Sequence, residues 1–266
     1  MLSASDAWGY TLGEIFNRGK LVEPRNQTCF EIQDRQVTIN MCAPVVGHKA
    51  RKLNYSFMAA EAMWIISGSN RVEDIAPYNP NIAQFSDDGE VFAGAYGPPI
   101  AAQWAWVLEK LHEDRDTRQA TLTIWERGPA PSKDIPCTVA MNFRIRNSLL
   151  NVSVFMRSSD VWLGLPYDLF NFSMLGTKLC CDFNLVYPSE TPITPGVLTV
   201  TAASMHLYHR DLNSAYELLY NSPIANTVEA LPIPQIIAGD WSFFYVSLRA
   251  CRDKVDVNPK LWKIRP

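Results

Sequence analysis

Cys137 is a candidate nucleophile in this 266-residue sequence. It follows Ile135-Pro136, opens an alternating apolar segment and comes after a loop rich in glycine and proline. A side chain in such a place could face a ligand, and the thiolate of cysteine attacks electrophilic carbon. A lone cysteine is still more often a packing residue, so its position alone leaves both interpretations open.

Glu61 is the one charge in residues 56–68, an otherwise apolar segment that begins with serine and ends with glycine. This pattern predicts a buried helix with Ser56 as its N-cap and Gly68 as its stop. A charged, unpaired carboxylate inside it would cost several kcal/mol, so Glu61 must be hydrogen-bonded, protonated or functional. The pattern favours neither a functional carboxyl nor a structural pair.

Further polar residues interrupt apolar segments. Residues 157–160, Arg-Ser-Ser-Asp, end a strand pattern, and Asp168 precedes a long apolar helix pattern. A solvated turn would explain residues 157–160, but it would not explain Asp168. His206 and Tyr208 end another strand pattern, where they could cap the sheet or bind a ligand hydroxyl.

The elements that must position these residues follow from the apolar periodicity. Helical spacing predicts helices over residues 7–19, 56–68, 100–112, 169–185 and 209–220, and alternation predicts strands over residues 36–41, 120–125, 139–145, 150–156 and 197–204. A turn at Arg146-Asn147-Ser148 joins two of the strands as a hairpin. Residues 77–99, which carry Tyr96, predict an irregular surface segment. We expect an α+β fold with one domain over residues 1–266 and a mixed sheet flanked by helices.

The composition narrows the function. With 24 Lys and Arg against 27 Asp and Glu, the chain lacks the basic excess that binding to polymeric nucleic acid usually needs. No apolar run reaches the roughly 18 to 20 residues of a membrane span, and residues 1–6 do not resemble a signal peptide, so a cytoplasmic protein is expected. The six cysteines show no metal-binding spacing, so we expect reduced thiols and no metal.

Three motifs occur in an order and spacing that resemble the thymidylate synthase superfamily. They are Ile-Pro-Cys at residues 135–137, Met-Arg-Ser-Ser-Asp-Val-Trp-Leu-Gly-Leu-Pro-Tyr-Asp at residues 156–168, and His-Leu-Tyr at residues 206–208. The resemblance covers about residues 14–219. It implies that family's fold, in a homodimer whose sheets pack back to back. It also implies that a one-carbon unit passes from 5,10-methylenetetrahydrofolate to C5 of a pyrimidine nucleoside monophosphate.

The resemblance implies a role for each candidate residue. Cys137 would add to C6 of the pyrimidine, Glu61 would organise water and move protons, and Tyr96 would help to remove the C5 proton. Arg157 would favour the thiolate and bind phosphate. The other residues implied to bind substrate are Arg25, Arg118, Ser158, Asp168, His206 and Tyr208, with Arg118 reaching the phosphate across the dimer interface and His206 and Tyr208 holding the ribose hydroxyl.

Two departures from thymidylate synthases point to cytosine. Asp168 stands where those enzymes have an asparagine that pairs with uracil through one donor and one acceptor. An ionised aspartate only accepts, which suits the amino group and a protonated N3 of cytosine. Thr138 replaces a histidine that usually follows the nucleophile. Both features resemble the phage deoxycytidylate hydroxymethylases, which implies conversion of dCMP to 5-hydroxymethyl-dCMP for a modified DNA base.

Alternatives remain at this point. Ala83 stands where the resemblance places a tryptophan that shields the reactive methylene, so water would give a hydroxymethyl product and hydride a methyl product. A dCMP 5-methyltransferase that releases dihydrofolate is therefore a second hypothesis. A CMP hydroxymethylase is a third, because His206 and Tyr208 would meet the 3′-hydroxyl of either sugar. A catalytically silent nucleotide-binding relative is disfavoured because Cys137, Glu61, Tyr96 and Arg157 are all kept.

Overall fold

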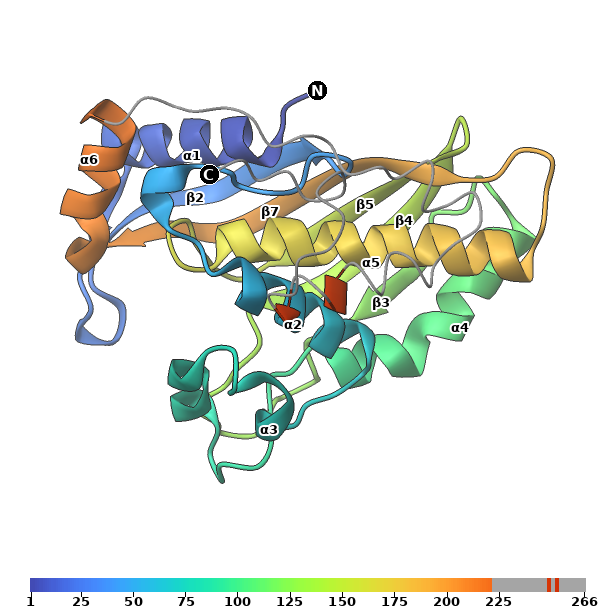
Figure 1. The fold of residues 1–266 in the computed structure, drawn as a ribbon, viewed down its shortest axis with the longest axis horizontal. Coiled ribbons are helices and arrows are strands. Elements are labelled where there is room, and N and C mark those ends of the chain that lie inside the picture. The colour runs from blue at the N-terminus through green and yellow to red at the C-terminus, as the bar shows by residue number, and fades with distance from the viewer. Residues whose placement is uncertain (222–247, 250–251, 254–266) are drawn as a thin grey trace.

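The computed structural model describes residues 1–221, 248–249 and 252–253, and a mixed β-sheet with helices against it forms the fold (Figure 1). The sheet order is β1-β2-β7-β5-β4-β3, and β6 pairs with β7 beside this path. The strands are β1 (Lys20–Val22), β2 (Cys29–Asn40), β3 (Thr121–Thr123), β4 (Thr138–Arg146), β5 (Leu149–Met156), β6 (Ser159–Asp160) and β7 (Thr194–Tyr208). Strands β5 and β6 run parallel to β7 and the other pairs are antiparallel, which confirms the predicted α+β class.

The helices are α1 (Ala4–Arg18), α2 (Tyr55–Ile66), α3 (Val72–Ile75), α4 (Gly97–Glu113), α5 (Leu165–Val186) and α6 (Leu212–Asn221). Short 3-10 helices lie at Pro24–Asn26, Lys49–Arg51, Pro80–Phe85 and His209–Asp211. No helix among the described residues is long and apolar enough to cross a membrane. Because part of the C-terminal chain lies outside the described residues, a single domain over residues 1–266 stays a prediction.

The starts of α2 and α5 are among those that differ from the sequence prediction, and they bear on the site. Helix α2 is capped by Asn54, whose side chain accepts a hydrogen bond from the Phe57 amide at 3.0 Å, so Ser56 is not the cap. Helix α5 begins at Leu165, four residues early, because Pro166 suits a first helical turn, where no intrahelical N–H bond is needed. Asp168 therefore lies within the first turn of α5 instead of before the helix.

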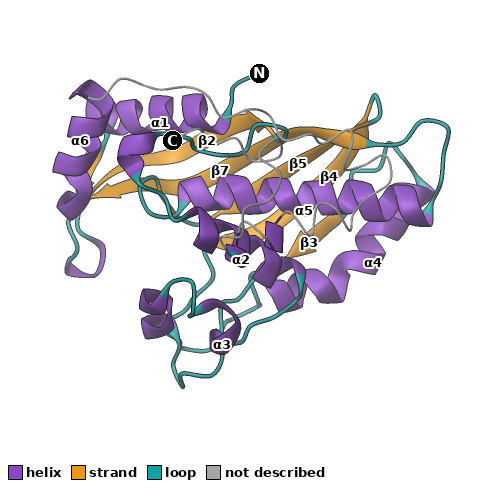
Figure 2. Ribbon diagram, in the orientation of Figure 1, coloured by secondary structure: helices purple, strands orange, loops and turns teal. Residues whose placement is uncertain are grey.

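One face of the sheet is covered by helices (Figure 2). Helices α1 and α5 pack against β2, β5 and β7 and also contact each other. Strand β5 buries every second residue, from Leu150 to Met156, as the predicted alternation requires. The residues between them lie on the other face, where Phe155 is 45% exposed and the hydroxyls of Thr38 and Thr199 are 3.1 Å apart.

The β4–β5 hairpin places the ends of its two strands side by side. Asn147 and Ser148 both have positive φ, 51° and 58°, which suits the tight turn that joins two twisted strands. The predicted turn is therefore confirmed. At the opposite end of the hairpin Thr138 pairs with Met156, so the residue before β4 and the residue after β5 are neighbours.

Strand β7 changes its buried face along its length. Leu198, Val200 and Ala202 are buried in its first part, but Met205 and Leu207 are buried in its last part. The change from even to odd numbers falls opposite Asp34 of β2, which has a φ of 52°. A local irregularity of this kind redirects the side chains that follow it. His206 and Tyr208 are thereby kept out of the core.

Candidate active site

Arg157 holds the loop that carries Cys137. Its Nε donates to the Pro136 carbonyl at 2.9 Å, and its Nη2 donates to the Ile135 carbonyl at 2.8 Å. The backbone N–H of Arg157 also donates to the Cys137 carbonyl at 2.9 Å. The hairpin accounts for this contact, since Cys137 precedes β4 and Arg157 follows β5. The structure therefore brings the predicted nucleophile and its predicted cation together.

The Cys137 thiol is partly buried, and this burial raises its pKa. The positive charge of Arg157 opposes the rise, and so does the Ser158 hydroxyl, whose Oγ lies 3.7 Å from Sγ. No carboxylate among the described residues pairs with Arg157, whose guanidinium lies 5.9 Å from the centre of the Trp125 ring. Its charge therefore remains available to the thiolate and to an anionic ligand.

Glu61 of α2 faces α5, where the Asn171 side-chain amide donates to its Oε2 at 2.7 Å. Burial raises the pKa of Glu61 to about 7, and the hydrogen bond from Asn171 limits the rise. Of the possibilities left open by the sequence, the structure shows a carboxyl that is hydrogen-bonded to an amide and not paired with a cation. Such a group can take up and release a proton near neutral pH.

Tyr96 is the residue before α4, and its ring stacks on Phe172 of α5 with ring centres 6.4 Å apart. Burial raises the pKa of Tyr96 well above its ordinary value, and the charges of Asp168 and Cys137 raise it further. The phenol is therefore neutral at physiological pH. It can relay a proton only if its oxygen accepts one proton while its own hydroxyl proton leaves.

The fold raises the pKa of the Asp168 carboxyl. Burial is the main cause that raises its pKa well above the ordinary value, and the charges of Glu61 and Asp160 add to it. The helix N-terminus favours a negative charge but contributes less than this burial costs. The raised pKa favours the protonated form more than in a solvated aspartate, and the ionised form expected from the sequence stays a prediction. A neutral carboxyl has one donor and one acceptor, and its proton can sit on either oxygen.

His206 and Tyr208 form a second group with Asp160, which lies opposite His206 in the β6–β7 pairing. Burial lowers the pKa of His206, although the Asp160 charge opposes this, so the imidazole is neutral and carries one donor and one acceptor. The rings of His206 and Tyr208 are 5.0 Å apart. A cavity of about 210 Å³ adjoins Tyr208 and is lined by Gln27, Thr28, Tyr208, His209 and Arg210.

Two other arginines expected to bind substrate, Arg25 and Arg118, take no part in the hydrogen bonds described above. Arg25 is exposed in the Pro24–Asn26 turn, and its charge contributes to the lowered pKa of His206. Arg118 is exposed in the loop before β3, where its carbonyl accepts a hydrogen bond from Asn142. Cys137, Arg157 and Ser158 together are called the Cys137 group below. Within the described chain, no contact joins Arg118 to this group.

The sequence interpretation missed three residues: Asn171, Asp160 as the partner of His206, and Arg210, which lies 4.3 Å from the centre of the Tyr208 ring. A signal for Asn171 was present, because it follows Asp168 by three residues and such residues share a helix face. Asp160 was visible only as the last of the polar residues 157–160, and nothing in the sequence marked its pairing with His206 or the contact of Arg210 with the Tyr208 ring.

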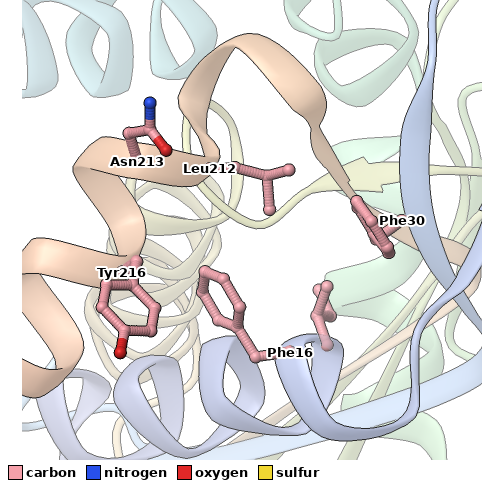
Figure 3. A pocket seen from close by; sticks show the side chains of 6 residues that line it. Phe16, Phe30, Leu212, Asn213 and Tyr216 are labelled. Carbon is pink, nitrogen blue, oxygen red and sulfur yellow. The ribbon is translucent and has the colours of Figure 1, made fainter.

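A cavity of about 320 Å³ between α1, β2 and α6 contains none of the predicted site residues (Figure 3). Its lining consists of Ile15, Phe16, Phe30, Leu212, Asn213 and Tyr216. Among the described residues no group of three or more His, Cys, Asp or Glu could hold a metal ion.

Comparison with known proteins finds matches to thymidylate synthases and to related hydroxymethyltransferases. The profile of the family described as Thymidylate synthase matches residues 8–237. The chain is 32% identical over 223 residues to the deoxyuridylate hydroxymethyltransferase of Bacillus phage SP01, covering 75% of this chain and 56% of that protein. It is 28% identical over 189 residues to the deoxyuridylate hydroxymethyltransferase of Pseudomonas phage M6, covering 66% and 52%. It is 25% identical over 197 residues to the thymidylate synthase of Enterobacteria phage T4, covering 65% of each. The chain thus spans about half of the length of the two hydroxymethyltransferases.

Proposed function

Because this chain belongs to the thymidylate synthase family, we propose that it transfers a hydroxymethyl group to C5 of a pyrimidine deoxynucleoside monophosphate in the cytoplasm. The observation that carries this proposal is the Cys137 loop, which Arg157 holds beside its own positive charge. The names of the two phage hydroxymethyltransferases support the hydroxymethyl product.

The chain's own groups suit each step. The Cys137 sulfur forms a bond to C6, and the electrons of the C5–C6 double bond move to C5, which becomes nucleophilic. When bound, 5,10-methylenetetrahydrofolate supplies a carbon at the oxidation level of formaldehyde. Glu61 fits this partner at its reacting end, because removal of the C5 proton needs a group that exchanges protons near neutrality. Tyr96 would relay a proton through its neutral hydroxyl. Arg157 and Ser158 bind the phosphate.

Deoxycytidylate is the first candidate substrate. Ionised Asp168 would accept hydrogen bonds from the cytosine amino group and a protonated N3. Protonated Asp168 would accept from the amino group and donate its own proton to N3. Deoxyuridylate is the second candidate, because the same carboxyl with its proton on the other oxygen can donate to O4 and accept from N3–H. The similarity to two phage deoxyuridylate hydroxymethyltransferases favours this second base. An asparagine amide would have to rotate by half a turn to make the same exchange.

We predict that Asp168→Asn shifts the ratio of kcat/KM for dUMP to that for dCMP upward by at least about tenfold, equivalent to roughly 1.4 kcal/mol. An ionised Asp168 sets an acceptor against uracil O4, whereas an asparagine amide can donate to O4. A mismatched partner in a desolvated site leaves buried polar atoms unpaired, which costs about 1 to 3 kcal/mol. Steady-state rates with both nucleotides give the ratio. Asp182→Asn is the matched control, because Asp182 lies on α5 but binds Trp104 and should leave the ratio unchanged. A wild type that uses dUMP as well as dCMP would assign the enzyme to deoxyuridylate.

The proposed reaction is tested by folate-dependent tritium release from C5 of dCMP, CMP and dUMP, followed by the mass of the product. Release with a hydroxymethyl product supports the proposal, and a methyl product with dihydrofolate supports the methyltransferase. Release from CMP at the rate of dCMP would support a ribonucleotide substrate. No release from any of the three would support a silent nucleotide-binding relative.

We also propose a homodimer in which Arg118 completes the partner's phosphate site. The sheet face opposite the helices carries exposed Phe155 and the partly exposed Thr199, which suits a surface covered by a second sheet. Arg118 is exposed and lies outside the Cys137 group of its own chain.

Mixing two inactive variants tests this arrangement. Arg118→Ala and Cys137→Ala should each lose activity alone, but mixed dimers hold one site with an intact Cys137 and an intact Arg118. Statistical exchange makes half of the dimers mixed with one working site in two, so activity should return to about a quarter of the wild-type value. Sedimentation at micromolar concentration measures the oligomer. A monomer, or no recovery after subunit exchange, would contradict the shared site.

A further inference from the structure

Asn171 is a buried polar residue, and within the described residues only the nitrogen of its side-chain amide has a hydrogen-bond partner. Its side chain is 4% exposed on α5, and its Nδ2 donates to Glu61 at 2.7 Å. Its Oδ1 is buried and has no hydrogen-bond partner within the described residues. Buried amide oxygens are nearly always paired, so an unpaired one beside a proton-carrying carboxyl points to a missing ligand.

The position of this oxygen limits what the ligand can be. Oδ1 and Nδ2 share one carbon atom, so Oδ1 lies next to the Glu61 carboxyl. The carboxyl and Oδ1 together offer two neighbouring acceptors when Glu61 is ionised. A water molecule donates two hydrogen bonds, and it matches such a pair.

Building on the hydroxymethyl transfer proposed above, we propose that Asn171 and Glu61 together hold the water whose oxygen becomes the hydroxyl of the product. The water oxygen bonds to the exocyclic methylene carbon at C5, and its proton passes to the Glu61 carboxylate. The electrons of the methylene double bond move into the ring, restore the C5–C6 double bond and expel the Cys137 thiolate from C6. No oxidant or reductant is consumed, whereas the methyl product would require a hydride.

Asn171 is a positioning residue in this step. It fixes one Glu61 oxygen through Nδ2, and it orients the water through Oδ1. Removal of the C5 proton precedes the step and does not need the ordered water. Loss of Asn171 should therefore separate proton removal from hydroxymethyl formation.

Asn171→Leu removes both hydrogen bonds at nearly constant volume. We expect the ratio of hydroxymethyl product to C5 tritium release to fall at least about tenfold, with the missing turnovers returned as tritium-free substrate or methyl product. Its pH profile should also shift, because loss of the Asn171 hydrogen bond favours the neutral form of Glu61. The ionisable neighbours of Glu61 in the described chain are Asp168 and Tyr167, which both variants and controls retain.

Thr177→Val is the matched control. Thr177 is also buried on α5, but its hydroxyl donates to the Ser173 carbonyl and lies outside the site, so the ratio should stay at the wild-type value. Asn171→Asp keeps the shape of the side chain and serves if Asn171→Leu does not fold. Its protonated form retains a donor and an acceptor, so it should couple the two steps better at low pH than at high pH.

The outcomes separate the two proposals. If the wild type shows no folate-dependent tritium release, the proposed function fails and the role of Asn171 fails with it. If the wild type forms the hydroxymethyl product but both Asn171 variants keep its ratio at every pH, the function stands and the water site is overturned.

Discussion

Replacing Cys137 by alanine is expected to abolish folate-dependent turnover, with a loss of at least about a thousandfold. The sulfur forms a bond to C6 along the reaction path, and no other group beside the base can replace it. The ground-state affinity for the nucleotide should change little, because Arg157 would hold its phosphate and His206 and Tyr208 would hold its ribose.

Turnover, nucleotide affinity and adduct formation measure this effect. The wild type should form a covalent adduct with a 5-fluoropyrimidine deoxynucleotide, visible by mass, and Cys137→Ala should form none. Cys42→Ala is the matched control, since Cys42 is also a partly buried free thiol. Retained folate-dependent activity in Cys137→Ala would remove the covalent mechanism, and an adduct in that variant would assign the nucleophile to another cysteine.

Replacing Glu61 by glutamine is expected to lower activity by at least about a hundredfold while stabilising the fold above neutral pH. The loss follows because the amide cannot exchange a proton near pH 7. The gain in stability follows because the folded and unfolded states bind different numbers of protons. The pKa of Glu61 is about 7 in the folded protein and about 4.5 in the unfolded chain, so the folded state binds more protons between these values.

The sign of the pH effect is therefore fixed. The favourable contribution of Glu61 is complete below about pH 4.5 and is lost as pH rises towards 7, so above pH 7 the ionised carboxylate destabilises the fold by up to about 3 kcal/mol. Glutamine lacks this penalty. Urea unfolding of wild type and Glu61→Gln should agree near pH 4.5 and diverge up to pH 8, with the variant more stable. Glu109→Gln, on the exposed side of α4, should show no divergence. A variant less stable than the wild type at pH 8 would contradict a desolvated Glu61.

Local features of the sequence were sufficient for most elements. The hairpin turn needed only two residues that tolerate positive φ, and the buried helix α2 followed from its apolar composition. The hairpin also placed Cys137 beside Arg157, because antiparallel pairing joins the start of one strand to the end of the next. Each of these relations depends on residues close together in the chain.

The pKa shifts in the site depend on the tertiary structure. Burial and the charges of Glu61 and Asp160 raise the pKa of Asp168, and no neighbour in the sequence shows this. Glu61 meets Asn171, 110 positions away, where α2 packs on α5. Likewise, His206 escapes the core through an irregularity opposite Asp34, which simple alternation does not encode. A pKa depends on the solvent and the charges around a group, and packing brings these from distant segments. The sequence therefore offered candidate side chains but not the shifts in their pKa.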